Sequence, residues 1–369
     1  MPYVRKIELS DILPKLPNIS KIQMDRDFRG RKDDLFLCAL GFEDRCTSIP
    51  RMISEEKGYS CNEAVYFEYS LNPEDNEINR AGLVESLGRF STAVSSMQSD
   101  SDEFVATLRQ TLVRLCHDGK IPKITFDISV CSSILLITVL KILFEAHIEL
   151  RLVYSEARIY HPTRDEVDKN EPKSNEEIFF LTSGVSEVFP SSGYPGRNPD
   201  SLPEAIVAFA TFSLERTNKV ISYIDENLTQ KRGERIVWIV GEPHLEADRW
   251  RIDYVMKINK IRREDPCMTL STFDYKETLK TLNKIYKQYT PKYHLNISPL
   301  GSKIQSLGIA MFHFMKPDIT IIFAPPVKYF AGRYSEGYKD TWIIDFGNLK
   351  EIRSLLDEVG IIKVEDKKI

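Results

Sequence analysis

The sequence predicts an α/β protein built from two tandem copies of one unit, each a mainly parallel sheet flanked by helices. Two observations lead to this prediction. Short apolar runs alternate with longer helix-like stretches along most of the 369 residues, which is typical of strands joined by crossover helices. The same order of elements then recurs about 170 residues later, which indicates an internal duplication of a Rossmann-like lobe.

Each expected strand of the first copy has a counterpart in the second. Most strands are followed by a helix-like segment, and the offsets at the anchor residues lie between 169 and 171, for example from Arg45 to Arg216. A sixth apolar run in each copy completes the pattern. The paired strands are Leu35–Gly41 with Ala205–Phe212, Glu63–Tyr69 with Arg235–Gly241, Ser91–Ser95 with Met268–Thr272, Lys123–Ser129 with Tyr293–Ser298, Ile148–Tyr154 with Ile319–Ala324, and Ile178–Thr182 with Thr341–Asp345.

The duplication divides the chain into five expected parts. A lead-in rich in Lys, Asp and Pro precedes the first lobe, and a segment dense in turn formers, from Ser191 to Pro199, reads as a linker. The expected parts are a lead-in at 1–31, a first lobe at 32–190, a linker at 191–203, a second lobe at 204–348, and a closing helix with a polar tail at 349–369.

Composition favours a globular protein in a reducing compartment. The formal net charge is −4, which gives no global reason to expect a polyanion partner. Net charge does not exclude a local basic cleft. Six cysteines occur without a C-x-x-C pair, and no apolar stretch reaches the length of a membrane span. We expect a cytoplasmic protein without a structural metal, a cofactor or a membrane partner, and a homodimer is compatible with this composition.

The first candidate site follows the first strand of each copy. Ligands of open parallel sheets bind beyond the carboxyl ends of the strands, so the loops at these ends are examined first. Glu43 and Asp44 precede Arg45 at the start of an expected helix, and Glu215 precedes Arg216 in the second copy. Acidic residues complement a helix N-terminus, but an arginine does not, so Arg45 and Arg216 are either internal ion-pair partners or ligand contacts.

The second candidate site follows the fourth strand. Gly301, Ser302 and Lys303 precede an expected helix and offer backbone N–H groups, a hydroxyl and an ammonium, a combination that suits a phosphate or another anion. The alternative is a serine N-cap beside a solvated lysine. The equivalent loop of the first copy carries only serines: Ser129, Ser132 and Ser133.

The third candidate site follows the fifth strand. Tyr160 and Tyr329 stand at equivalent positions among cations, and an aromatic ring beside cations can stack a base and neutralise phosphate. Buried tyrosines that pack under a loop are the alternative. The candidate ligand contacts here are Arg158, Arg164, Lys328, Tyr329 and Arg333. Of the six histidines, His161 and His244 lie near strand ends.

The second-copy loop Asn296–Lys303 resembles a motif of CRISPR-associated Rossmann-fold (CARF) domains, a strand followed by Gly-Thr-Lys and a helix. Ser302 stands in place of the threonine, and Lys303 matches the lysine. Two such units in one chain are similar to SAVED domains, which resemble a fused CARF pair. The resemblance implies a sensor of oligonucleotide messengers in prokaryotic antiviral defence, and some CARF members also cleave their ligand. The first copy departs from the motif.

Three functions follow as hypotheses. The first is a sensor that binds a nucleotide or oligonucleotide ligand between the lobes, through Arg45, Ser302 and Lys303, and signals to a separate effector protein. The second is an enzyme of the phosphodiesterase or ring-nuclease type, in which Glu43 or Asp44 supplies acid–base or metal-ligand chemistry beside cations that hold the phosphate. The third is a scaffold subunit of a defence complex.

Overall fold

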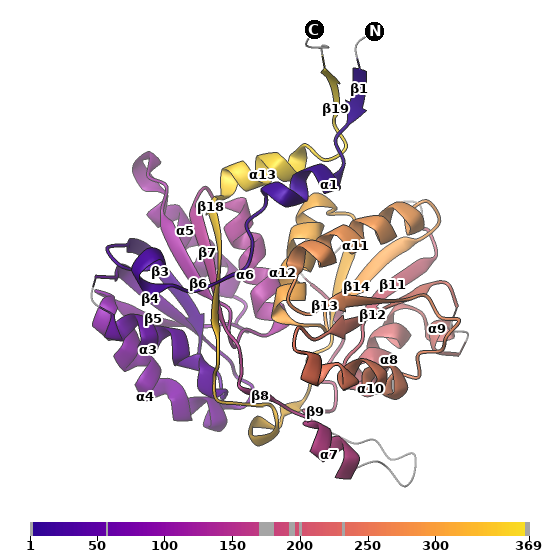
Figure 1. Cartoon of the computed structure of the whole chain (residues 1–369), viewed down its shortest axis with the longest axis horizontal. Helices are drawn as coiled ribbons and strands as arrows, with labels where there is room; N and C mark the ends of the chain where they lie inside the picture. The colour runs from indigo at the N-terminus through magenta and orange to yellow at the C-terminus, as the bar shows by residue number, and fades with distance from the viewer. Residues whose placement is uncertain are drawn as a thin grey trace.

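A computed structural model describes residues 3–56, 58–169, 181–191, 196–198, 201–230 and 233–365 of the chain. Two α/β lobes lie side by side, each built on its own mainly parallel sheet (Figure 1). In both lobes the parallel strands follow the order third, second, first, fourth, fifth of the copy. The predicted fold class, two tandem Rossmann-like lobes from an internal duplication, is therefore confirmed.

The central strands of the first sheet are mostly buried apolar runs, as expected for a sheet covered on both faces. In spatial order its parallel strands are β5 (Val94–Gln98), β4 (Ser60–Glu68), β3 (Lys32–Ala39), β6 (Lys123–Asp127) and β7 (Glu149–Ser155). The antiparallel strand β18 (Thr341–Asn348) follows beside β7, and β2 (Ser20–Lys21) forms the edge. The lead-in therefore contributes a strand to the first lobe.

The second sheet repeats this arrangement. Its parallel strands are β13 (Cys267–Ser271), β12 (Ile236–Glu242), β11 (Glu204–Phe209), β14 (His294–Ser298) and β15 (Thr320–Phe323), and β10 (Phe189–Pro190) pairs antiparallel with β15.

Helices cover both faces of each sheet. The outer faces pack against α3 (Ser48–Glu55) and α4 (Pro73–Phe90) in the first lobe, and mainly against α8 (Leu214–Ile224) in the second. The inner faces carry α5 (Phe104–Leu115), α6 (Ser133–Glu145), α11 (Tyr275–Tyr289) and α12 (Lys303–Met315). The remaining helices are α1 (Leu9–Ile12), α2 (Met24–Asp27), α7 (Arg164–Lys169), α9 (Glu226–Gln230), α10 (Trp250–Ile258) and α13 (Leu349–Asp357).

The two lobes share one core. Helices α6 and α12 are apolar on nearly all sides and pack against each other between the sheets (Figure 1). A helix with apolar side chains all round must be buried. The apolar cluster that contains Leu136 of α6 and Leu307 of α12 continues into both sheets, so the lobes do not have separate cores.

The final strand of each copy lies in the sheet of the other copy. Strand β18 comes after the second lobe in the chain but pairs with β7, placing Trp342 opposite Tyr154. Strand β10 comes before the second lobe but pairs with β15, placing Phe189 opposite Phe323. The expected boundaries at 190 and 348 are therefore wrong at these two strands. An apolar run predicts a strand, but it does not say which sheet the strand joins.

The exchange obeys the internal symmetry. Tyr154 and Phe323 are 169 residues apart, and their partners Trp342 and Phe189 are 153 apart. The sixth elements therefore correspond at an offset of 153, not in the pairing of 178–182 with 341–345, and residues 178–180 lie outside the described ranges. The crossing segments repeat the same backbone hydrogen bonds: His161 N to Tyr334 O (3.2 Å) matches Phe330 N to Leu181 O (3.0 Å), and Lys339 N to Glu156 O (2.9 Å) matches Ser186 N to Pro325 O (3.0 Å).

Two short ladders join the crossing segments. Strand β8 (Ile159–Tyr160) pairs with β17 (Ser335–Glu336), and β16 (Lys328–Tyr329) pairs with β9 (Thr182–Ser183). The predicted equivalence of Tyr160 and Tyr329 holds, because each tyrosine lies in the short strand that follows the fifth strand of its copy. Each crossing segment therefore pairs with the other copy at two places, a short ladder and a sheet edge.

The two ends of the described chain also meet. Strand β1 (Tyr3–Lys6) pairs with β19 (Ile362–Glu365), and the resulting ribbon extends beyond α1 and α13 (Figure 1). Residues 362–365 are thus a strand and not part of a polar tail, and residues 366–369 lie outside the described ranges. None of the helices in the described residues combines the length and apolar character that a membrane crossing requires.

Because each sheet contains a strand of the other copy and the core is continuous, the lobes should unfold together. We expect a single calorimetric transition for the wild-type chain. Replacing the buried Ile344 of β18 by alanine should lower the stability of both lobes by about 2–5 kcal/mol without splitting the transition. Val113→Ala, at an exposed position, is the control. Two separate transitions would contradict the shared core.

Candidate functional site

A cavity of about 1090 Å³ lies between the lobes, where the carboxyl ends of both parallel sheets face each other. Loops after β3, β6 and β7 line it from the first lobe, and loops after β11, β12, β14 and β15 line it from the second. This is the location expected for ligands of open parallel sheets. The duplication brings two such locations together in one cavity.

The cavity wall combines aromatic side chains with a surplus of cations. Phe209, Phe212, Tyr254 and Phe273 contribute rings from the second lobe. The lining cations are Arg45, Arg216, Arg251, Lys257, Lys260 and Lys303, against the carboxylates of Glu156, Glu215 and Asp248. Such a wall suits a ligand with both flat rings and negative charge.

The loop Gly301–Lys303 forms the N-terminus of α12 at this cavity. Ser302 is the N-cap: its hydroxyl accepts from Gln305 N at 3.1 Å and donates to Thr272 O at 2.6 Å. Gln305 Oε1 accepts from Ser302 N in return, which completes a capping box. Ser302 therefore acts as the N-cap that the sequence offered as an alternative, and its hydroxyl is already engaged by the protein.

Gly301 is required by packing and not by backbone conformation. A Cβ at this position would lie 2.9 Å from Phe209 Cδ1 and 2.4 Å from Gln305 Oε1. Any side chain would push against the aromatic wall or the capping box. Gly301 thus allows the loop to lie flat beneath the cavity.

Lys303 is the exception among these residues, because its ammonium feels the charge of Glu43 only at a distance and has no direct partner among the described residues. The side chain is half-buried and lines the cavity, and its ammonium makes no hydrogen bond or ion pair within the described part of the chain. Burial, and secondly the charge of Arg45, lower the pKa of Lys303 to about 8. The amine is therefore still mostly protonated at pH 7, and an approaching anion favours the charged form further.

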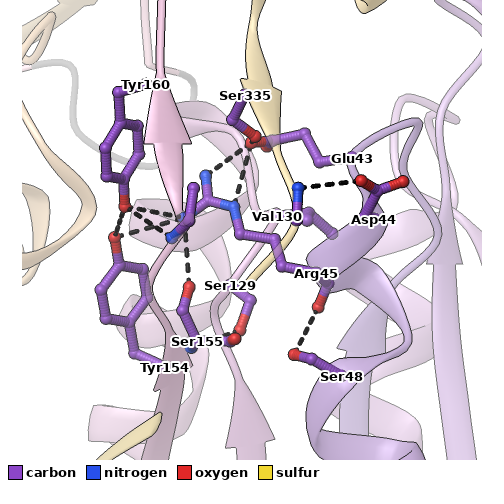
Figure 2. A network of polar contacts seen from close by, with 12 residues as sticks. Glu43, Asp44, Arg45, Ser48, Ser129, Val130, Tyr154, Ser155, Tyr160 and Ser335 are labelled. Atoms are coloured by element: carbon purple, nitrogen blue, oxygen red, sulfur yellow. Dashed lines mark hydrogen bonds and ion pairs between the residues drawn. The ribbon is translucent and has the colours of Figure 1, made fainter. Parts of the chain in front are cut away.

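Arg45 lies at the centre of a buried network (Figure 2). Its Nε and Nη2 donate to Glu43 Oε2 at 3.0 and 2.7 Å, and its Nη1 donates to the carbonyl of Ser155 at 3.2 Å. The hydroxyls of Tyr154 and Tyr160 accept from the same Nη1 at 3.2 and 3.3 Å. Of the two alternatives for Arg45, an internal ion pair is the one observed, although Arg45 also borders the cavity.

The expected catalytic role of Glu43 and Asp44 is not supported, because neither residue lines the cavity. Glu43 Oε2 also accepts from the hydroxyl of Ser335, and Asp44 Oδ2 accepts from Gly337 N at 2.9 Å. Burial alone would raise the pKa of Glu43, but the charges of Arg45 and Lys303 outweigh it and keep the pKa below its usual value. Both carboxylates hold the crossing segment near β17.

Arg216 occupies the equivalent place in the second lobe. Its Nε donates to the carbonyl of Ala324 at 2.7 Å, as Arg45 donates to that of Ser155. Ser155 is the last residue of the fifth strand of its copy, and Ala324 directly follows the fifth strand of the other. Ala324 and Ser155 are 169 residues apart. Unlike Arg45, Arg216 is half-buried and has no carboxylate partner among the described residues.

The serines of the first-lobe loop have structural partners. Ser132 caps α6 by accepting from Leu135 N at 3.1 Å, and Ser133 borders the cavity and lies 3.4 Å from Ser306 of α12. Ser129 is buried, donates from its backbone N to Asp127 at 2.9 Å, and accepts from Ser155 N at 2.8 Å. Ser129 is therefore not a ligand contact; it connects the ends of β6 and β7.

The third candidate site is divided by the structure. Tyr329 lines the cavity, but Arg158, Arg164, Lys328 and Arg333 are exposed and lie outside its lining. Arg164 instead pairs with Asp168 one turn further along α7, at 3.0 Å. Arg333 therefore does not share the cavity with Arg45 and Lys303, although the next residue, Tyr334, lines it.

Sequence reasoning missed a contact between the lobes at the cavity wall. His244 Nε2 of the second lobe lies 3.1 Å from Glu156 Oε1 of the first, and the His244 ring lies 4.7 Å from that of Phe273. Glu156 is buried, and its Oε2 has no hydrogen-bond partner. The positions of His244 and Glu156 near strand ends were a signal, but their pairing depends on how the lobes face each other.

No group of three or more His, Cys, Asp or Glu side chains suited to a metal ion occurs in the described ranges. His161, the other histidine near a strand end, lies between two carboxylates, with Nδ1 2.8 Å from Glu166 Oε2 and Nε2 3.1 Å from Glu336 Oε1.

Comparisons with known proteins add only distant likenesses. No protein-family model and no curated protein matches the sequence. Similar solved structures include the cytoplasmic domain of a prokaryotic cation chloride cotransporter (8% identity, 80% of this chain and 96% of the other, TM-score 0.24) and a functionally unknown protein from Pseudomonas aeruginosa PAO1 (8%, 80% and 93%, 0.23). A third is UDP-GlcNAc 2-epimerase from Neisseria meningitidis bound to UDP-GlcNAc (9%, 73% and 77%, 0.21). At these TM-scores the likenesses say nothing about function.

Asp127, which accepts from Ser129 beneath the Arg45 network, should make stability depend on pH. Burial raises its pKa from 3.8 to about 7. Because the folded state holds the proton more tightly, Asp127 contributes most stability below about pH 4, and this contribution is lost as pH rises through about 7. Asn296 occupies the equivalent place in the second lobe, 169 residues later, so asparagine fits this site.

Asp127→Asn should therefore stabilise the protein above about pH 7 and change it little near pH 4. Denaturant unfolding of both proteins across this range measures the difference. A constant difference between the two proteins at all pH values would show that folding does not shift the pKa of Asp127.

Proposed function

We propose that the chain is an intracellular sensor that binds a nucleotide-like anionic ligand in the cavity between its lobes. Lys303 carries this proposal. Lys303 lines a cavity whose wall is rich in cations, and its ammonium makes no hydrogen bond or ion pair in the described part of the chain. A half-buried cation without a direct ion-pair partner is costly, and an anionic ligand would relieve that cost.

The dimensions of the cavity favour a ligand larger than a mononucleotide. Small-molecule pockets typically measure about 300–1,000 Å³, and this cavity reaches the upper end of that range. Its aromatic side chains, such as Phe212 and Tyr254, offer faces on which bases can stack. The resemblance of Asn296–Lys303 to CARF and SAVED domains supports an oligonucleotide messenger, a role in prokaryotic antiviral defence, and a separate effector protein that receives the signal.

The positions of Glu43 and Asp44 favour a sensor over an enzyme in which these two residues are catalytic. Both carboxylates are held by hydrogen bonds to the crossing segment and lie outside the cavity lining. A ligand in the cavity contacts both lobes, so its binding is felt by the crossing segments that join them. This is the coupling that a sensor requires.

Lys303→Ala should weaken the binding of an anionic ligand by about ten- to a hundredfold. A charge-assisted hydrogen bond contributes roughly 1.5–3 kcal/mol, and about 1.4 kcal/mol corresponds to a factor of ten. Calorimetric titration with mono-, di- and cyclic oligonucleotides at two salt concentrations measures the effect. Lys328→Ala, which removes an exposed cation outside the cavity, is the matched control. Equal affinity of wild type and Lys303→Ala, or no binding by any panel member, would refute the proposal.

Ligand affinity should also fall as pH rises from about 7 to 9.5. The pKa of Lys303 lies near 8, so the free amine loses its proton in this range and the ammonium contact with the ligand becomes weaker. A cyclic di-adenylate is a suitable probe, since its phosphodiesters and bases do not titrate there. The dependence should disappear in Lys303→Ala. An identical pH profile in wild type and variant would show that Lys303 does not contact the ligand.

A further inference from the structure

The equivalent arginines of the two lobes, Arg45 and Arg216, have different hydrogen-bond partners. In the first lobe, one carboxylate oxygen of Glu43 accepts two hydrogen bonds from Arg45, at 3.0 and 2.7 Å, and a third from the hydroxyl of Ser335. An oxyanion thus lies between a guanidinium and a hydroxyl of the exchanged segment (Figure 2). The first lobe supplies this oxyanion from its own chain.

The second lobe has the arginine but no such carboxylate. Glu43 stands two residues before Arg45, and Leu214 stands two residues before Arg216. Glu215, directly before Arg216, makes no ion pair with it in the structure, and both residues belong to the described part of the chain. Arg216 uses only its Nε, toward Ala324, so its two Nη groups keep their donors for another partner.

The hydroxyl of the exchanged segment has a counterpart as well. Ser335 pairs with Tyr160 in one ladder, and Thr182 pairs with Tyr329, the equivalent of Tyr160, in the other. A glycine at positive φ follows two residues later in both segments, Gly337 at +58° and Gly184 at +65°. Thr182 is 7% exposed and lines the cavity, and its hydroxyl makes no hydrogen bond within the described residues. Thr182 is therefore the equivalent of Ser335.

We infer that Arg216 and Thr182 form an oxyanion subsite that binds a phosphoryl group of the ligand where the first lobe holds the carboxylate of Glu43. Arg216, Thr182 and Leu214 all line the cavity, and the Tyr329 ring lies beside them, as Tyr160 lies beside Arg45. A phosphoryl oxygen accepts from a guanidinium and a hydroxyl as a carboxylate oxygen does. This inference rests on the proposed function and adds a second anchor to Lys303.

The subsite is tested by giving the second lobe the carboxylate that Glu43 supplies in the first lobe. Leu214→Glu places an acid two residues before Arg216, and this side chain should compete with the ligand for the guanidinium. Affinity for cyclic di-adenylate should fall at least tenfold. Leu214→Gln has the same shape without the charge and should bind at least fivefold more tightly than Leu214→Glu. Arg216→Gln should also lose at least tenfold.

Inorganic phosphate is the second probe, read as a shift of the melting temperature. Phosphate should stabilise wild type, and it should stabilise Leu214→Glu less. The Leu214→Glu protein without added anion should melt at or above the wild-type temperature, because it carries its own counter-charge. This comparison reports on the subsite even if no nucleotide binds.

The outcomes separate this inference from the proposed function. If Lys303→Ala weakens nucleotide binding while Leu214→Glu and Arg216→Gln bind like wild type, the subsite is wrong and the sensor proposal stands. If no nucleotide binds but phosphate stabilises wild type and not Leu214→Glu, the subsite stands and the sensor proposal fails. If neither nucleotide nor phosphate affects wild type, both fail.

Discussion

The exchange of the last strand between the copies is the constraint on which the rest of the structure depends. Strand β18 can pair with β7 only if the chain leaves the second lobe and crosses to the first, and β10 requires the reverse crossing. The carboxyl ends of the two sheets are therefore held face to face, with the crossing segments near the cavity that they border. A simple tandem of two lobes joined by a linker would not fix this distance. The exchange turns two open sheet ends into one enclosed site.

The buried pair of Arg45 and Glu43 fixes one of these crossings. A buried ion pair gains little over well-packed apolar side chains, but losing one partner typically costs about 3–5 kcal/mol, because the other charge is left buried. Here the pair also positions other segments of the chain, because Glu43 accepts from Ser335 and Arg45 donates to the carbonyl of Ser155. The network therefore ties the first strand, the fifth strand and the exchanged segment at one point. Its role is one of specificity more than of net stability.

Local pattern predicted the repeated strands and helices, because apolar runs and helix starts depend on nearby residues. It also predicted the turn at Gly301–Lys303, where the N-cap serine and the lysine are adjacent in sequence. It failed at the sixth strand, because an apolar run such as Thr341–Asp345 is compatible with either sheet edge, and because β10 has only two residues and no periodicity. Thr182 and Glu156 were missed for the same reason: their neighbours are defined by the exchange. Arg158 and Arg333 were misplaced because they lie close in sequence to tyrosines that line the cavity, and the sequence does not say to which side of the segment each side chain points.

The two copies have kept the same scaffold and diverged in charge. Ser132 and Ser302, 170 residues apart, cap α6 and α12 in the same way, yet the next residue is Ser133 in one and Lys303 in the other. The equivalent arginines have diverged too, since Arg45 is neutralised within its own lobe and Arg216 is not. Both changes leave the second lobe with a cation that has no direct ion-pair partner among the described residues. In the proposed complex, the first lobe therefore contributes mainly a rigid part of the cavity wall, and the second lobe contributes the cations that bind the negative groups of the ligand. A ligand that fits this division carries its negative groups along one side, so the approximate twofold symmetry of the fold does not require a twofold-symmetric ligand.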